Sequence, residues 1–379
     1  MKLLHTSDLH IGKRVNSFSM LEEQQYMLER IFAIAKEEQP DAIILAGDIY
    51  DKGVPPTEAV TLFDDFLWKL ATLDKLVLLI SGNHDSAERL AFGHRLLANN
   101  SVYVSPAYDG SVKPIAWKQD GLCVDFYLLP FVKPTTVQHY APEGTELKSY
   151  DAAVRHAIGE MQVDASHVNV LLTHQYITDA ERSDSEEVAI GGLDNVDAAA
   201  FESFDYVALG HLHRPQHCQR NTVRYSGSPL KYSFSEVDDQ KSVTLVEIVG
   251  KGDVKVTERP LTPLHDWHDL RGCYDELVEK DFYDGTPYQE DFVRITLTDE
   301  EDIPDAMRRL QSIYHRLMEL HYDNKRTRAG YTQIGEAEAP ERRMPDEIFA
   351  ELYEKQNGQP IGEEQKQYLQ SVIGEVFSG

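Results

Sequence analysis

The sequence predicts a layered α/β domain, followed by a small α+β domain and a C-terminal pair of helices. Two observations predict the first domain: short apolar runs alternate with segments of helical periodicity, and several of those runs end in polar motifs. A third observation is a proline-bracketed stretch at 260–263, after which this pattern stops. We therefore expect domains at 1–262, 263–340 and 341–379.

The first part of the α/β domain alternates strands with helices. Apolar runs of five to seven residues predict strands, and longer segments with apolar residues three or four positions apart predict helices. A proline at position 40 ends the first helix. In chain order, the expected elements are strand 2–6, helix 22–39, strand 42–46, helix 57–71 and strand 75–81.

The second part of this domain is richer in strands. After Pro106 the chain has little helical periodicity apart from 151–161. Strand-rich segments that follow an α/β layer predict a second sheet packed on the first. The expected strands are 122–131, 169–174, 206–209, 223–226, 242–249 and 253–259.

The C-terminal part predicts a strand at 291–297, a helix at 304–320 and two amphipathic helices at 346–355 and 363–377. An amphipathic helix must bury its apolar stripe, and two short helices are unstable alone. A linker rich in Glu, Arg and Pro precedes the pair, so we expect them to bind a partner; the alternative is a tail packed on the preceding domain. The apolar stripes comprise Phe349, Leu352, Tyr353, Tyr368, Val372 and Phe377.

Composition limits the possible functions. The chain has 37 Lys and Arg against 64 Asp and Glu, a formal net charge of −27. This argues against a simple nucleic-acid coat protein, but not against a nuclease whose metal ions supply local positive charge. Three cysteines without close spacing, the lack of a signal peptide and the lack of a membrane-spanning apolar run predict a cytoplasmic protein.

Five short motifs lie at the ends of predicted strands and carry metal-ligand residue types. They are Asp8-Leu-His10, Gly47-Asp48, Gly82-Asn-His-Asp85, Thr173-His174 and Gly210-His-Leu-His213. The carboxyl ends of parallel strands meet at one edge of a sheet, so these side chains can converge. Carboxylate, amide and imidazole ligands together suit Mn, Fe, Zn or Co better than Mg. Each motif alone is ordinary, but their coincidence predicts a site for two divalent metals, with Asp48 as the bridge.

At these motifs the chain resembles the calcineurin-like metallophosphoesterase family, which carries all five in the same order. The resemblance implies a β-sandwich flanked by helices, a dinuclear metal centre and phosphoester hydrolysis. Longer stretches are similar to the SbcD branch of this family, bacterial nucleases that act with an SbcC-type ATPase. These stretches are His5–Gly12, Gly47–Asp51, Tyr206–His213, Tyr225–Leu230 and Ser233–Glu236.

The resemblance also implies roles for individual residues. Asp8, His10, Asp48 and His213 would hold the first metal, and Asp48, Asn83, His174 and His211 the second, with Mn²⁺ the expected ion. His84 would lie beside the scissile phosphate, oriented by Asp85. Where archaeal and eukaryotic relatives have a further histidine, this chain has Asp51, so that role is not transferred. The DNA groove would be lined by Lys13, Arg14, Ser226 and Ser228, for which a solvated loop is the alternative.

The activity that the resemblance implies is 3′–5′ exonuclease action on double-stranded DNA and endonuclease action on single strands and hairpins, in DNA repair, recombination and replication. The 263–340 domain would cap the DNA. Two copies would join two copies of the SMC-like ATPase in a heterotetramer. A homodimer is expected through Leu62, Phe66, Leu90 and Leu97, unless these pack on their own sheet. The alternatives are a phosphoesterase for small phosphoesters or phosphoproteins, and a non-catalytic scaffold.

Overall fold

The computed structural model describes residues 1–119, 121–186, 195–325, 327–328, 349, 353, 361–362, 365–366 and 369. These residues fall into two compact units. Unit 1 contains Met1–Thr296 and Pro304–His321, and unit 2 contains Leu297–Ile303 and the chain from Tyr322 onward. The predicted boundaries at 262 and 340 remain predictions.

The first sheet of unit 1 has six strands in the order β16-β15-β1-β4-β5-β6. The pairs among β1, β4, β5 and β6 are parallel, and β15 joins β1 antiparallel. Apolar residues of the central strands β1 and β4 are fully buried, as a sheet covered on both faces requires. The strands are β1 (Lys2–Thr6), β4 (Ala42–Ala46), β5 (Leu76–Ile80), β6 (Val102–Val104), β15 (Ser242–Gly250) and β16 (Asp253–Pro260).

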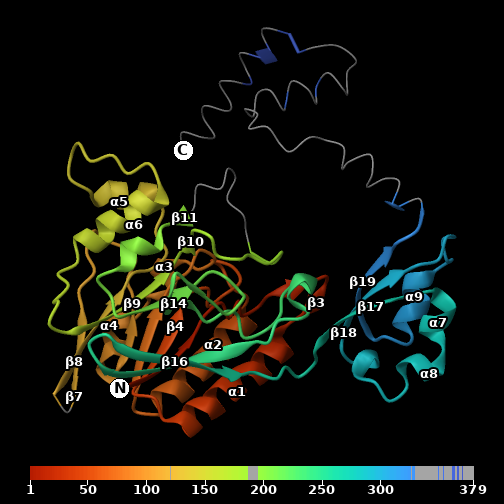
Figure 1. The fold of residues 1–379 in the computed structure, drawn as a ribbon, viewed down its shortest axis with the longest axis horizontal. Coiled ribbons are helices and arrows are strands. Elements are labelled where there is room, and N and C mark those ends of the chain that lie inside the picture. Colours follow the sequence, from red (N-terminus) through yellow and green to blue (C-terminus); the bar gives the residue numbers. More distant parts are fainter. Residues whose placement is uncertain are drawn as a thin grey trace. The chain divides into compact units, whose positions relative to one another are not determined.

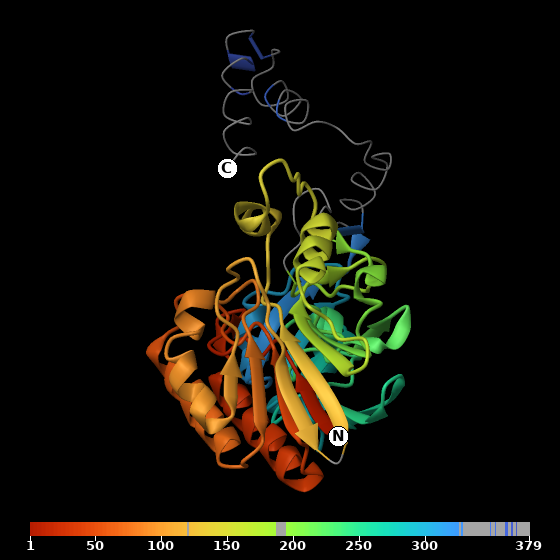
Figure 2. The ribbon, with the colours of Figure 1, turned by 90° about the vertical axis from the view of Figure 1, so that its left-hand side faces the viewer.

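Helices connect the parallel strands of the first sheet and lie outside it, in red and orange in Figure 2. Right-handed crossovers place successive connecting helices on one face of a sheet. Their apolar residues form one core with that face, which includes Met27, Ile31, Phe63 and Phe66. The helices are α1 (Leu21–Glu38), α2 (Thr57–Ala71), α3 (Ala87–Leu90), α4 (His94–Leu97) and the 3-10 turn η1 (Ala98–Asn100), while β2 (Arg14–Val15) and β3 (Phe18–Ser19) form a small hairpin.

The second sheet has the order β13-β14-β12-β9-β8-β7, with antiparallel strands at its two edges. Its bounds are β7 (Ile115–Gln119), β8 (Leu122–Leu128), β9 (Val168–His174), β12 (Tyr206–Gly210), β13 (Gln216–Cys218) and β14 (Arg220–Tyr225). The outer face is covered by α5 (Pro134–Tyr140), α6 (Tyr150–Gly159) and η2 (Ala198–Phe201), near the short pair β10 (Tyr176–Ile177) and β11 (Asn195–Val196).

The two sheets pack face to face. Their facing side chains form a separate apolar core that includes Leu3, Ile44, Phe126, Val170 and Ala208. Figure 1 and Figure 2 show the strands of both sheets between outer helices. The predicted β-sandwich flanked by helices is therefore confirmed.

Unit 1 also contains a three-stranded sheet in the order β17-β18-β19. The expected strand at 291–297 is confirmed as β18, but the expected helix at 304–320 is wrong. That segment forms a short helix and then β19, whose buried Leu317 and Met318 complete the sheet. The elements are β17 (Trp267–Gly272), α7 (Tyr274–Val278), α8 (Lys280–Tyr283), η4 (Pro287–Gln289), β18 (Phe292–Leu297), α9 (Ala306–Gln311) and β19 (Arg316–Tyr322).

Unit 2 is small in its described part. The backbone amide of Asp323 donates to the Leu297 carbonyl at 2.8 Å, and Asn324 Nδ2 donates to the Asp299 carbonyl at 3.3 Å. Of the residues expected to bind a partner, Phe349 and Tyr353 are helical, and Phe349 is exposed. Leu352, Tyr368, Val372 and Phe377 lie outside the described residues. Among the described helices, none has the length and apolar character needed to cross a bilayer.

The residues expected to form a dimer contact mostly pack inward. Phe66 is buried in the core beneath α2, and Leu62, Leu90 and Leu97 are half-buried against that core. Large apolar side chains on α2, on α4 and in the turn before α4 face solvent instead: Trp68 is 68% exposed, Leu96 73% and Phe92 87%. The alternative that the four predicted residues pack on their own sheet is therefore the one that the structure favours.

Candidate metal centre

The structure brings together all seven residues predicted as metal ligands. Asp8 and His10 follow β1, Asp48 follows β4, and Asn83 follows β5 in the first sheet. From the second sheet, His174 ends β9, while His211 and His213 follow β12. All these positions are at carboxyl ends of parallel strands, so facing sheets contribute to one site, as the general rule for α/β sheets predicts.

Four of the candidate ligands surround one point. His10 Nε2 lies 3.1 Å from His213 Nε2 and 3.6 Å from Asp48 Oδ2. Asp8 has a carboxylate oxygen within 4.8 Å of ring nitrogens of His10 and His213. All four side chains are buried. Two ring nitrogens directed at each other beside two carboxylates form a donor set that a divalent cation would satisfy.

Asp48 connects this group to a second one. His174 Nε2 lies 3.2 Å from Asp48 Oδ2 and 3.0 Å from Asn83 Oδ1. His211 Nδ1 also lies 3.0 Å from Asn83 Oδ1. The other ring nitrogen of His174, Nδ1, lies 2.9 Å from the Ala46 carbonyl, to which it can only donate. This contact leaves Nε2 of the neutral ring free to bind a metal.

The backbone around these residues is unusual. Asp8, His10, Asp48 and His211 all have positive φ angles, between 45° and 107°. Such angles cost energy in residues other than glycine and persist where the surrounding structure enforces them, often at functional sites.

Two of the glycines that precede the motifs are required by close approach. A Cβ atom on Gly82 would lie 2.1 Å from Asp48 Oδ1, and one on Gly210 would lie 2.0 Å from the Ala46 carbonyl oxygen. Both distances are far below van der Waals contact, so any larger residue would displace the neighbouring backbone.

The electrostatics of the site favour positive charge. Burial alone would raise the pKa of Asp48, but the rings of His174, His10 and His84 hold that pKa well below its usual value. Burial lowers the pKa of His174, yet Asp48 outweighs it and raises that pKa to about 9. Burial lowers the pKa of His211 to about 3, so its ring is neutral and able to act as a ligand. A carboxylate kept anionic among histidines suits a cation site.

His84 and Asp85 have partners different from those expected. His84 Nδ1 lies 3.0 Å from the Asp51 carbonyl oxygen, and a ring nitrogen lies within 4.8 Å of Asp48 and His10. The Asp85 carboxylate accepts the backbone amides of Ile49, Tyr50 and Gly82 at 2.9–3.0 Å. The ring of His84 is therefore oriented by Asp51, whereas Asp85 joins the loops that follow β4 and β5.

The residues predicted to line a DNA groove divide into two groups. Arg14 is exposed and donates to the Ser17 carbonyl. Lys13 Nζ lies 3.0 Å from Asp51 Oδ1 and 5.4 Å from the centre of the Tyr232 ring. Ser226 and Ser228 are fully buried, which leaves their side chains no surface with which to contact DNA. Ser226 Oγ instead lies 2.9 Å from Ser7 Oγ, which donates to Asp8.

Several residues around His213 lie outside the five motifs and were not predicted. Ser185 Oγ lies 2.6 Å from His213 Nδ1, and Glu186 Oε1 accepts the His213 backbone amide at 2.7 Å. Glu236 and Lys241 lie behind them, joined at 2.6 Å. Glu236 belongs to the Ser233–Glu236 stretch that carried part of the family resemblance, so a signal existed for that residue alone.

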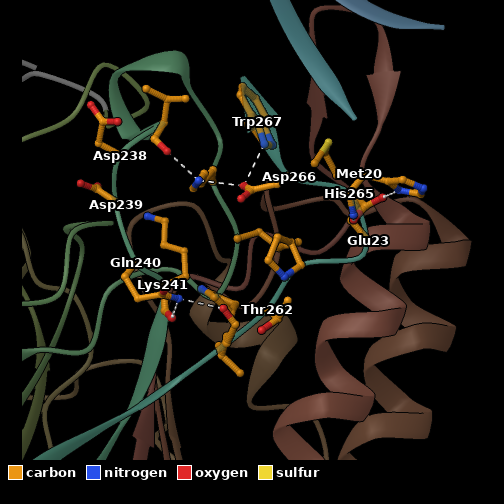
Figure 3. Close-up of a pocket in the computed structure, with 16 residues that line it drawn as sticks. Met20, Glu23, Asp238, Asp239, Gln240, Lys241, Thr262, His265, Asp266 and Trp267 are labelled. Carbon is orange, nitrogen blue, oxygen red and sulfur yellow. Dashed lines mark hydrogen bonds and ion pairs between the residues drawn. The ribbon is translucent and has the colours of Figure 1, made fainter. Parts of the chain in front are cut away.

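A cavity of about 300 Å³ lies apart from this centre (Figure 3). Trp267, Asp266, His265, Glu23 and Lys241 line its walls, and its described lining includes none of the seven candidate ligands. Several of its charged groups are paired within the chain, as in the contacts of Lys231 with Asp266 and of His265 with Glu23. The site defined by the motifs is therefore not this cavity.

Comparisons with known proteins agree with this geometry. Residues 1–215 match the family model of calcineurin-like phosphoesterases, and residues 260–357 match a model described as the type 5 capsule protein repressor C-terminal domain. The SbcD subunit of the nuclease SbcCD from Staphylococcus epidermidis is 34% identical over 84% of this chain and 85% of that protein. The protein of the same name from Staphylococcus saprophyticus is 30% identical over 98% of both chains. The chain belongs to the calcineurin-like phosphoesterase family, in the group of the SbcD nuclease subunits.

Proposed function

We propose that this protein is a dinuclear-metal DNA nuclease. The observation that carries the proposal is the arrangement of seven ligand-type side chains, from both sheets, in two groups that share Asp48. The relatives named as nucleases support a nucleic acid as the substrate, and we propose DNA. We further propose the specific activities expected from the sequence: 3′–5′ exonuclease action on double strands and endonuclease action on single strands and hairpins.

The ligand assignment follows the two groups that meet at Asp48. The first metal would be held by Asp8, His10, Asp48 and His213, and the second by Asp48, Asn83, His174 and His211. The mixture of nitrogen and oxygen donors supports a transition metal over Mg²⁺, and we propose Mn²⁺ as the ion. When bound, the two metals would lower the pKa of a water molecule and stabilise charge on the phosphate.

In this proposal His84 would donate a proton to the substrate, and Asp51 and Asp48 would hold His84 in position. With Nδ1 of His84 donating to the Asp51 carbonyl, Nε2 is the nitrogen available to a substrate oxygen. Protonated His84 can then donate through Nε2 to the oxygen that leaves phosphorus. The Asp51 carbonyl stabilises the imidazolium through the other ring nitrogen. Asp48 accepts the His84 backbone amide at 2.9 Å, so the proposed acid and the bridging ligand are held together.

The full chain is expected to cleave linear double-stranded DNA and DNA hairpins in the presence of Mn²⁺, and to lose this activity to background after metal removal with EDTA. Re-addition of Mn²⁺ should restore cleavage. Gel assays on end-labelled DNA measure both activities, and a nitrophenyl phosphodiester serves as the comparison substrate. A chain that hydrolyses the small phosphodiester but no DNA would favour a generic phosphoesterase, and a chain that binds no metal would favour a scaffold.

The proposed partner is an SbcC-type ATPase, in a heterotetramer with two copies of each protein, acting in DNA repair, recombination and replication in the cytoplasm. The match of residues 260–357 to a second family model supports a function for the C-terminal part beyond the phosphoesterase domain. We propose 263–340 as the DNA-capping domain and 341–379 as the partner-binding segment. In the gel assay, a chain without 341–379 should still cleave simple DNA. In a co-purification experiment, the same truncated chain should not bind the ATPase.

A homodimer is proposed through the solvent-facing side of α2, α3 and α4. These helices and the turn between α3 and α4 carry the exposed Val60, Trp68, Phe92 and Leu96. Monomers seldom expose many large apolar side chains together, and aromatic residues are enriched at interfaces. A second copy of the same surface is the proposed occupant, since symmetric contacts are the commonest route to a dimer.

Light scattering at micromolar concentration is expected to show a dimer. Replacing Trp68 and Phe92 together by glutamate should give a monomer, because loss of a central aromatic contact costs about 2 kcal/mol or more. Val249, which is 74% exposed on β15, provides the control: Val249→Glu should remain dimeric. A wild-type chain that is monomeric at this concentration would contradict the proposal.

A further inference from the structure

His213 is held at both ring nitrogens. Its Nε2 faces His10 Nε2 at 3.1 Å inside the candidate centre, and its Nδ1 lies 2.6 Å from Ser185 Oγ. A histidine can bind a metal only through a nitrogen without a proton, and the hydrogen bond made by the other nitrogen decides which one that is. The direction in which the Ser185 hydroxyl donates its hydrogen bond therefore decides which ring nitrogen of His213 carries the proton.

The direction of the hydrogen bonds follows from Glu236. Ser185 Oγ lies 2.6 Å from Glu236 Oε1. An ionised carboxylate only accepts hydrogen bonds, so the Ser185 hydroxyl donates to Glu236. Its oxygen is then free to accept from His213 Nδ1. In this order the proton of His213 is at Nδ1, and the lone pair of Nε2 faces the metal centre.

The contacts of Glu236 hold its carboxylate in place and favour its ionised form. Its side chain is fully buried, and Lys241 Nζ donates to Oε2 at 2.6 Å. Ser233 Oγ donates to Oε1 at 3.0 Å. Lys241 also donates to the His213 carbonyl at 2.8 Å and to Ser228 Oγ at 3.2 Å. The Lys241 ammonium therefore holds both the Glu236 carboxylate and the backbone of His213 in place.

Lys241 also lines the cavity described above. Figure 3 shows Lys241 beside Gln240 on the wall of the 300 Å³ cavity, whereas the partners of its ammonium group, Glu236, His213 and Ser228, are not part of that wall. Lys241 therefore belongs both to the wall of this cavity and to the hydrogen-bonded network around His213.

We propose that Glu236 is a positioning residue of the metal centre, which acts through Ser185 to fix the tautomer and orientation of His213. The inference rests on the proposed function, because His213 matters in this way only as a metal ligand. It assigns a role to the Ser233–Glu236 stretch, which contributes no metal ligand of its own.

The test measures Mn²⁺ binding to the full chain by calorimetry. Ser185→Ala and Glu236→Gln should each weaken one of two Mn²⁺ sites by about 10–100-fold and leave the other unchanged, because His213 is assigned to one metal only. The double variant should lose no more than Glu236→Gln alone, since both residues act through one hydrogen-bonded chain. Ser185 is only half-buried, so Ser185→Ala keeps the test valid even if Glu236→Gln fails to fold.

Ser233→Ala is the matched control. Ser233 contacts the same carboxylate without contacting His213, so this variant should bind Mn²⁺ at both sites within about twofold of wild type. Wild-type affinity in Ser185→Ala, or equal weakening in Ser233→Ala, would overturn the proposal. Asp48→Ala distinguishes failure of the positioning role from failure of the proposed function. If Asp48→Ala also binds Mn²⁺ normally, the metal-ligand assignment itself fails.

Discussion

Replacement of Asp48 by alanine is expected to abolish DNA cleavage and to lower metal occupancy at both proposed sites. The Asp48 carboxylate lies 3.6 Å from His10 Nε2 in one ligand group and 3.2 Å from His174 Nε2 in the other. Its removal therefore takes an anionic donor from both groups at once, while leaving several histidines facing one another. The other proposed ligands each serve one metal, so their alanine variants should retain one of the two ions.

Elemental analysis after dialysis measures bound Mn²⁺ per chain, and the gel assay measures cleavage. Asp125 provides the control, because it is another buried aspartate that pairs with a histidine, His167, at 2.8 Å. Asp125→Ala should bind both metals and cleave DNA, even if its melting temperature falls. Full metal occupancy in Asp48→Ala would show that this carboxylate does not bridge the two sites.

His84→Ala is expected to keep both metals and DNA binding while losing cleavage rate by about 10²–10⁴-fold, the usual contribution of general acid–base catalysis. The reason is that His84 contacts the Asp51 carbonyl through Nδ1 and is not needed by either proposed ligand group. The effect should therefore appear in kcat measured at saturating Mn²⁺ and DNA.

His94→Ala is the matched control for this variant. His94 also lies with Nδ1 2.8 Å from a backbone carbonyl, that of Ala91, but it is no part of the centre. It should cleave DNA at the wild-type rate. A fully active His84→Ala enzyme would refute the proposed acid, and loss of metal in that variant would make His84 a ligand instead.

Much of the candidate centre could be predicted from sequence because its residues are encoded locally. Each motif directly follows or ends a buried strand, and the carboxyl ends of parallel strands meet at one edge. The motifs therefore predict that Asp8, Asp48 and His174 converge, and the structure places them together. The glycines at 82 and 210 stand directly before ligand positions in the sequence, and the structure shows that neighbouring backbone leaves no room for a Cβ atom there.

Other features depend on which face of an element is buried, and local patterns leave that open. Helix α2 carries apolar residues all round, so Leu62 and Trp68 are equally able to form an interface as far as spacing shows. Only packing on the sheet shows that Phe66 is core and Trp68 is exposed. The segment 304–320 is similar: its apolar spacing fits a helix, but pairing in a three-stranded sheet makes its second half a strand.

The ligand types, their order at the strand ends and the family all follow from the amino-acid sequence. The surroundings of those ligands follow only from the tertiary structure. Ser185 lies 28 residues from His213 and 51 residues from Glu236 along the chain, yet the three form one hydrogen-bonded line. Asp51 likewise contacts His84 from 33 residues away. Hydrogen bonds between distant loops depend on how the sheets stack, and no local periodicity or motif spacing encodes that stacking.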